Sequence, residues 1–215
     1  MDDADPARWD ARRQHAADRS IDIALNAYGL KDQVRAGWVL RGVSAPESVA
    51  AHSWGTALLC LMFATDAGVD GGRAVAIATV HDLAEAEIGD IPARADAAER
   101  ELGVSDKARL EAAALTRMLG GDLAGLYALW REYEDGTSAE ARFARDMNLL
   151  DMALQAVLYE EQARYEPAAA VTSRGDHGPL DEFFASADAR VQGTLARHLL
   201  ERIRVRYRHA RRRSR

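Results

Sequence analysis

Cysteine is almost absent from this sequence of 215 residues, and long apolar runs are missing altogether. The single cysteine, Cys60, excludes an intrachain disulfide framework, and its apolar setting (ALLCLMFA) predicts a buried free thiol in a reducing compartment. No run approaches the ~20 apolar residues that span a bilayer, and the first ten residues (MDDADPARWD) lack the apolar segment of a signal peptide. We therefore expect a cytoplasmic protein with no membrane partner.

Lysine is also scarce, because only two of the 28 basic residues are lysines. The arginines gather at the C-terminus, where residues 202–215 hold eight of them and no acid. The rest of the chain is therefore more acidic than the net charge of −6 suggests. An acidic body is a poor platform for a nucleic-acid backbone, so we disfavour a nucleic-acid-binding accessory protein that works through this tail. We interpret the arginine-rich end as a solvated, frayed helix terminus.

Proline and glycine are few (5 and 16) and fall mainly between long segments rich in alanine and leucine. Apolar residues recur at spacings of three and four, and sustained alternation is absent, so the pattern predicts an all-α fold. Trp54, Leu58, Leu61 and Met62 have the spacing of a buried helix face. The longest irregular connection is predicted at 166–179. We expect one domain of six to seven helices, over 10–29, 47–66, 72–87, 96–119, 121–134, 138–163 and 180–208.

Chemistry concentrates in the segment AVAIATVHDLAEAEIGDIP (74–92). On a helix, His81 shares a stripe with three small or apolar residues, Ala74, Ile77 and Ala78. Glu85 lies one turn beyond His81 on the same face, Asp82 lies at the edge of that stripe, and Asp90 follows the helix end. An imidazole among carboxylates suits a divalent ion that accepts nitrogen and oxygen, such as Mn²⁺, Co²⁺, Fe²⁺ or Zn²⁺.

The same residues have simpler interpretations. A histidine on an apolar face is more often a hydrogen-bonded core residue than a ligand, and an adjacent aspartate often orients it. Glu85 would be an ordinary solvated residue of the helix. The spacing alone therefore leaves both interpretations open.

A longer set of motifs resembles a known family. GWVLRGVSAPESVAAHSW (37–54), VHDLAEAEIGDIP (80–92) and LWREYEDGTSAEARFARDMNLLDMALQAVLYE (129–160) together resemble the HD-domain phosphohydrolases, most closely their 5′-deoxynucleotidase branch. The resemblance runs in order over about residues 30–163. It implies an HD-type helical bundle with that core, preceded by an N-terminal helix over 1–29. Residues 164–215 would add a C-terminal helix with the arginine-rich tail, within the same domain.

The resemblance also implies roles for individual residues. His52, His81 and Asp82 match the family's ligands for one divalent ion. Glu85 and Asp90 match residues assigned to catalysis or to a second metal. Two upstream residues, Arg35 and Trp38, match positions that face the nucleotide phosphate and sugar. Arg41 is a second candidate for phosphate binding. Trp38 would otherwise be a core aromatic, and Arg41 a solvated surface residue.

The sequence departs from the family pattern at two places. Ala51 stands where an acidic residue usually precedes the first histidine. Asn148 stands where the family has its late metal aspartate, with Asp146 two residues earlier. An asparagine carbonyl can ligate a hard cation but brings no charge. Two residues are about 200° apart around a helix, so Asp146 could replace Asn148 only with a local change of register. Either residue remains a candidate for the fourth ligand.

The resemblance implies a metal-dependent hydrolase that removes the 5′-phosphate from deoxynucleoside or related nucleoside monophosphates. The ion would be Mn, Co, Fe, Mg or Zn. Relatives of this kind are often homodimers, and the apolar late helices could supply an interface. The alternative is a non-catalytic HD protein in which Ala51 and Asn148 mark an altered metal site that only binds a nucleotide or a partner.

Overall fold

The computed structural model describes residues 11–91, 104–121, 123–165 and 180–213. In these residues the fold is helical, with two isolated β-bridges (Val34 with Ser48, Val43 with Tyr165) and no strand. This confirms the predicted all-α class. Among the described helices, none combines the length and the apolar character needed to cross a bilayer. The connection predicted at 166–179, and residues 96–103 of the predicted fourth helix, lie outside the described residues.

The described helices are α1 (Ala11–Tyr28), the 3₁₀-helix η2 (Gly29–Lys31), α2 (Ala36–Leu40), α3 (Val49–Ala67), α4 (Gly71–Val80), α5 (Glu85–Ile88), α6 (Val104–Leu119), α7 (Ala124–Asp135), α8 (Ala139–Glu161), α9 (Asp181–Arg190) and α10 (Thr194–Arg213). Side-chain caps define three of the starts: Ser48, Asp70 and Ser138 each accept a backbone N–H three residues on. Gly68 and Gly136 end α3 and α7 in the left-handed conformation, which glycine adopts at little cost.

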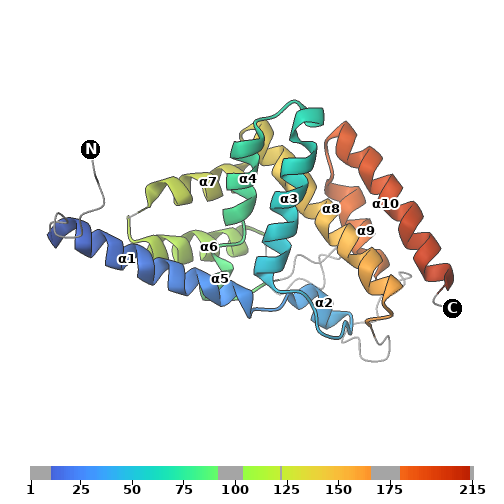
Figure 1. Ribbon diagram of the computed structural model, residues 1–215, viewed down its shortest axis with the longest axis horizontal. Helices are drawn as coiled ribbons and strands as arrows, with labels where there is room; N and C mark the ends of the chain where they lie inside the picture. Colours follow the sequence, from blue (N-terminus) through green and yellow to red (C-terminus); the bar gives the residue numbers. More distant parts are fainter. Residues whose placement is uncertain (1–10, 92–103, 122, 166–179, 214–215) are drawn as a thin grey trace, which may run out of the picture.

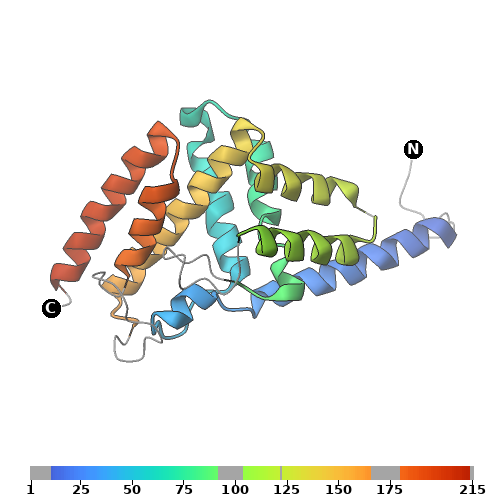
Figure 2. The ribbon, with the colours of Figure 1, turned by 180° about the vertical axis from the view of Figure 1, so that it is seen from behind.

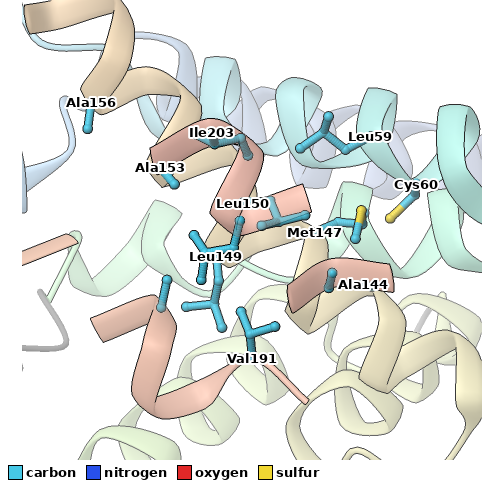
Figure 3. Packing of buried hydrophobic residues seen from close by; sticks show 14 of the residues in the cluster. Leu59, Cys60, Ala144, Met147, Leu149, Leu150, Ala153, Ala156, Val191 and Ile203 are labelled. Carbon is cyan, nitrogen blue, oxygen red and sulfur yellow. The ribbon is translucent and has the colours of Figure 1, made fainter. Parts of the chain in front are cut away.

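Two hydrophobic clusters meet at the middle of the molecule. The larger cluster joins α3, α4, α8, α9 and α10, and Figure 3 shows its centre around Met147 and Leu150. The smaller cluster joins α1, η2, α5, α6 and α7. Of these, α1, α6 and α7 extend to one side of α4 in Figures 1 and 2. Val49 in α3 and Val80 in α4 belong to the smaller cluster, whereas Cys60 and Ala78 belong to the larger. The first turn of α3 and the end of α4 therefore lie where the clusters meet.

Two predicted helices are divided in the structure. The predicted helix 72–87 becomes α4, a tight turn at 81–84, and α5. The predicted helix 180–208 becomes α9 and α10, separated at 191–193. At this second break the two carboxylate oxygens of Asp146 in α8 accept the backbone N–H groups of Gln192 (2.9 Å) and Gly193 (2.8 Å). A tertiary contact thus satisfies backbone donors that a continuous helix would have bonded internally.

The arginine-rich end is not frayed over its described part. Helix α10 continues to Arg213 and packs along α8, with Ile203, Tyr207 and Ala210 buried. Arg211 forms an ion pair with Asp181 of α9 at 2.8 Å. The prediction of a frayed terminus was therefore wrong over this part, whereas most of its arginines are exposed to solvent as predicted. The arginines flank an apolar stripe that the charge count concealed.

The predicted buried face of α3 was also wrong. Trp54, Leu61 and Met62 are more than half exposed, and Leu58 is 38% exposed. The core side of α3 is formed instead by His52, Thr56, Leu59, Cys60 and Ala64. Because α3 is apolar on nearly all sides, its pattern did not reveal which face the neighbouring helices would cover.

Candidate metal centre

His52 lies in the first turn of α3 and is fully buried. The Ser48 hydroxyl caps this turn by accepting the N–H of Ala51 at 3.2 Å, which fixes where the helix begins. Burial lowers the pKa of His52 to about 3, and the charge of Arg35 acts in the same direction. The imidazole is therefore neutral near pH 7 and can offer a nitrogen lone pair.

His81 and Asp82 lie in the tight turn between α4 and α5. Backbone bonds of the 3₁₀ type form this turn, from Leu83 N to Val80 O (3.1 Å) and from Glu85 N to Asp82 O (3.0 Å). The turn directs consecutive side chains to one centre, with Asp82 Oδ2 only 3.2 Å from His81 Nε2. A continuous helix would have left Asp82 at the edge of the stripe, as the sequence pattern alone predicted.

The two histidines present the same nitrogen to this centre. His81 uses Nδ1 for a 2.7 Å hydrogen bond with the carbonyl of Ala78, and His52 uses Nδ1 for a 2.7 Å contact with Asp151 Oδ2. Their Nε2 atoms are buried and have no well-formed hydrogen bond within the described parts of the chain. Asp82 Oδ2 lies 3.7 Å from Nε2 of His52.

This geometry fits a divalent cation. Ligand atoms of His52, His81 and Asp82 all lie within 4.8 Å of one another. Two orphaned imidazole nitrogens that face a carboxylate oxygen are a costly arrangement unless a cation joins them. Burial would raise the pKa of Asp82, but neighbouring His81 and Arg35 hold it below its ordinary value, so the carboxylate is ionised. The three side chains thus supply two imidazole nitrogens and one anionic oxygen.

Arg35 lies beside this triad, at the start of α2. Its Nη1 atom is 3.2 Å from Asp82, 3.6 Å from Asp90 and 3.9 Å from Glu85. Asp90 holds the same segment in place, since its Oδ2 accepts the N–H of Ala36 at 2.7 Å. Arg35 therefore lies close to three carboxyl groups at once, and all four side chains are largely buried.

Glu85 differs from Asp82. Burial raises its pKa well above the ordinary value, and the charges of Asp82 and Asp90 act in the same direction. Its Oε2 atom is buried and lacks a hydrogen-bond partner among the residues that the structure describes. A raised pKa favours the protonated form of Glu85, and a protonated carboxyl group can donate its proton to a bound molecule.

Lys107 is a member of this neighbourhood that the sequence analysis did not single out. It lies in α6, donates to the carbonyl of Ile91 at 2.9 Å, and approaches Glu111 (3.4 Å) and Glu85 (3.9 Å). The only signal in the sequence was its rarity, because it is one of two lysines in an arginine-rich chain. Glu47 and Asp151, which group around the other side of His52, were also missed.

Trp38 and Arg41 are held within the protein. Trp38 is 1% exposed, stacks on Phe183 with ring centroids 3.8 Å apart, and donates its indole N–H to Glu47 Oε1 at 2.9 Å. Arg41 forms an ion pair with Glu182 of α9. The structure thus gives Trp38 the core position that was its alternative interpretation, and it ties Arg41 to α9 rather than leaving it solvated.

The two candidates for the fourth ligand, Asp146 and Asn148, have different hydrogen-bond partners in the structure. Asp146 uses both carboxylate oxygens to hold the backbone between α9 and α10. Asn148 donates through Nδ2 to the hydroxyl of Tyr133 at 2.6 Å, and the Tyr133 ring lies beside His81, with centroids 5.0 Å apart. Asn148 is therefore linked to the His81 side of the centre, whereas Asp146 is engaged elsewhere.

The chain is similar to a known protein family over most of its length. The model of the HD domain family matches residues 27–177, and this range includes all the candidate site residues above. A protein from Bos taurus named 5′-deoxynucleotidase HDDC2 is 43% identical over 136 residues, which cover 61% of this chain and 63% of that protein. The chain thus spans less than two thirds of the bovine relative.

Two further relatives are matched over more of their length. The protein of the same name from Danio rerio is 35% identical over 165 residues, covering 75% of this chain and 74% of that protein. A crystal structure of a protein from Pyrococcus horikoshii superimposes with a TM-score of 0.66 and 33% identity, covering 87% of this chain and 98% of that one. The chain therefore belongs to the HD-domain family, as a relative of the 5′-deoxynucleotidases within it.

Proposed function

We propose that this protein is a metal-dependent hydrolase that removes the 5′-phosphate from deoxynucleoside or related nucleoside monophosphates. The observation that carries the proposal is the pair of buried Nε2 atoms of His52 and His81, which face the Asp82 carboxylate beside an arginine. The name 5′-deoxynucleotidase, which the bovine and zebrafish relatives carry, supports the substrate class. The ion would be Mn, Co, Fe, Mg or Zn.

The ion and the residues around the triad would have different roles in the reaction. A bound divalent ion would supply a Lewis acid for the phosphoryl oxygens and lower the pKa of a coordinated water. Arg35 would offer forked N–H donors to the phosphate, and Asp90 would hold Arg35 in place. Glu85, whose pKa is raised by burial, would give a proton to the leaving sugar oxygen. Lys107 would add positive charge beside Glu85.

The experiment that tests this function is a phosphate-release screen. Purified protein, stripped with a chelator, is incubated with each deoxynucleoside and ribonucleoside 5′-monophosphate and with each of the five ions in turn. We expect release from at least one monophosphate that depends on the added ion. Binding of an ion without release from any of these substrates would instead favour the non-catalytic HD protein.

We also propose that Asn148, rather than Asp146, completes the ligand set. The contact of Asn148 with Tyr133 supports this, because the Tyr133 ring lies beside His81. The carbonyl oxygen of Asn148 is the one atom of its amide that can ligate a metal. Asn148→Asp should therefore tighten divalent-ion binding by about tenfold, because it adds a charge next to the ion. Isothermal titration with Mn²⁺ measures this. An unchanged affinity in the variant would remove Asn148 from the set.

Two further properties belong to the same proposal. We infer a homodimer, and the exposed apolar side chains of Trp54, Leu58, Leu61 and Met62 on α3 favour that helix over the late helices as its interface. We also infer a cytoplasmic location, because Cys60 is a buried free thiol and burial raises its pKa to about 12, which leaves it unreactive. Sedimentation of a Trp54→Ser/Leu61→Ser variant tests the interface.

A further inference from the structure

Asp151 contacts His52 at the ring nitrogen that is not the proposed metal ligand. It lies in the middle of α8, its side chain is 14% exposed, and its Oδ2 is 2.7 Å from Nδ1 of His52. Nδ1 and Nε2 of an imidazole flank Cε1, and their in-plane bonding directions diverge. Asp151 therefore contacts His52 at Nδ1, while Asp82 and His81 lie toward Nε2.

The grouping of possible ligand atoms supports this separation. Asp151 groups with Glu47 and His52, whereas His81 and Asp82 group with His52 alone, each set lying within 4.8 Å. A second ion between Nδ1 and Asp151 does not fit the 2.7 Å distance. Two atoms that bind one tetrahedral metal at about 2.0–2.1 Å are more than about 3 Å apart. The contact is therefore a hydrogen bond, and when Asp151 is ionised only Nδ1–H can donate it.

Gly55 makes the room for this hydrogen bond. It lies three residues after His52 on the same face of α3, where α3 packs against α8. A Cβ atom at position 55 would lie 2.1 Å from Asp151 Oδ1 and 3.0 Å from Asp151 Cγ. Any other residue there would displace the carboxylate. A glycine inside a helix costs about 0.5–1 kcal/mol of stability relative to alanine. The space that Gly55 leaves for the Asp151 carboxylate explains why a glycine occupies this position.

We propose that Asp151 is a positioning residue that acts on the metal centre through His52. Gly55 leaves the space in which the Asp151 carboxylate reaches His52. The inference rests on the proposed metal site. The hydrogen bond fixes the tautomer of His52 with the proton on Nδ1, directs the Nε2 lone pair toward Asp82, and increases the basicity of that nitrogen. His81 receives the weaker partner, a backbone carbonyl. A side chain thus tunes only one of the two imidazoles.

The experiment compares ion affinity among variants of the full chain. Gly55→Ala, Asp151→Ala and Asp151→Asn are titrated with Co²⁺ at pH 8, because burial raises the pKa of Asp151 to about 7. Gly125→Ala in α7 is the matched control, since a Cβ there meets nothing within 4 Å. We expect Gly55→Ala and Asp151→Ala to weaken Co²⁺ binding by about 10- to 100-fold, and Gly125→Ala to leave it unchanged. Asp151→Asn, which keeps an acceptor but loses the charge, should fall between.

The double variant Gly55→Ala/Asp151→Ala shows whether the two residues act as one unit. We expect it to bind Co²⁺ no more weakly than Asp151→Ala alone, because the added methyl then has no carboxylate to displace. Additive losses would contradict the role given to Gly55. Wild-type affinity in Asp151→Ala would overturn the whole inference, and so would the loss of one oxygen ligand from the X-ray absorption spectrum of its cobalt form.

A second readout does not depend on the metal. Proton–nitrogen NMR of the histidine side chains should show a protonated, strongly deshielded Nδ1 for His52 in the wild type, and Gly55→Ala should abolish that signal. A protonated Nε2 in wild-type His52 would contradict the proposed tautomer. A wild type that binds Co²⁺ and shows this signal, yet releases no phosphate, would refute the proposed function while leaving this inference intact.

Discussion

Replacing His81 by alanine should abolish phosphate release while the protein stays folded. His81 is 3% exposed, its Nδ1 is fixed by the Ala78 carbonyl, and its Nε2 faces Asp82 at 3.2 Å. The variant lacks one of the two imidazole nitrogens of the triad. We expect the rate to fall by at least about 10³-fold, equivalent to about 4 kcal/mol of transition-state stabilisation. Asp82→Ala should have the same effect.

The measurement is phosphate release from the best substrate of the screen, together with the metal content of the purified protein. His198→Ala, which changes an exposed histidine of α10, serves as the control and should keep the wild-type rate. The helical circular dichroism signal should survive in all three variants, because the triad lies between the two hydrophobic clusters rather than within either one. Wild-type turnover in His81→Ala would exclude the triad from the reaction.

The sequence predicted the long helices well, because their apolar periodicity agrees with how they pack. Helix α8 was predicted over 138–163 and spans Ala139–Glu161, and α1 was predicted over 10–29 and spans Ala11–Tyr28. The two breaks were missed for a common reason. Each depends on a contact or a turn that helical propensity does not encode, namely the Asp146 carboxylate at 192–193 and the 3₁₀ bonds at 81–84. Short α2 was missed because five residues carry too little periodicity.

The site was predictable where chemistry and spacing coincide. His81, Asp82 and Glu85 stand out as polar residues at the end of an apolar helix, and the structure brings the first two together with His52. Asp151 was not predictable in the same way, because an acid in an amphipathic helix ordinarily faces solvent. Its direction follows from the packing of α3 on α8 and from the absence of a side chain at Gly55. A contact of this kind, between helices that are distant in the sequence, becomes visible only once the packing of the two helices is known.

Glu85→Gln should lower the rate of phosphate release by about 10²–10⁴-fold and leave ion affinity unchanged. The glutamine keeps the size of the side chain but has no proton to transfer. Burial raises the pKa of Glu85 well above its ordinary value, and a divalent charge in the neighbouring triad acts in the opposite direction. The two effects bring the carboxyl group toward the pH range in which an acid both holds and releases a proton.

The pH profile distinguishes this role from a purely structural one. A group with a raised pKa is protonated below that pKa, so an acid role predicts that the wild-type rate falls as pH rises through it. In Glu85→Gln this alkaline limb should disappear, because the residual rate no longer depends on that proton. Glu87→Gln is the matched control on the same short helix, since Glu87 instead pairs with Arg117 at 3.1 Å. A Glu85→Gln variant that keeps the wild-type rate and the alkaline limb would show that the leaving oxygen takes its proton from another group.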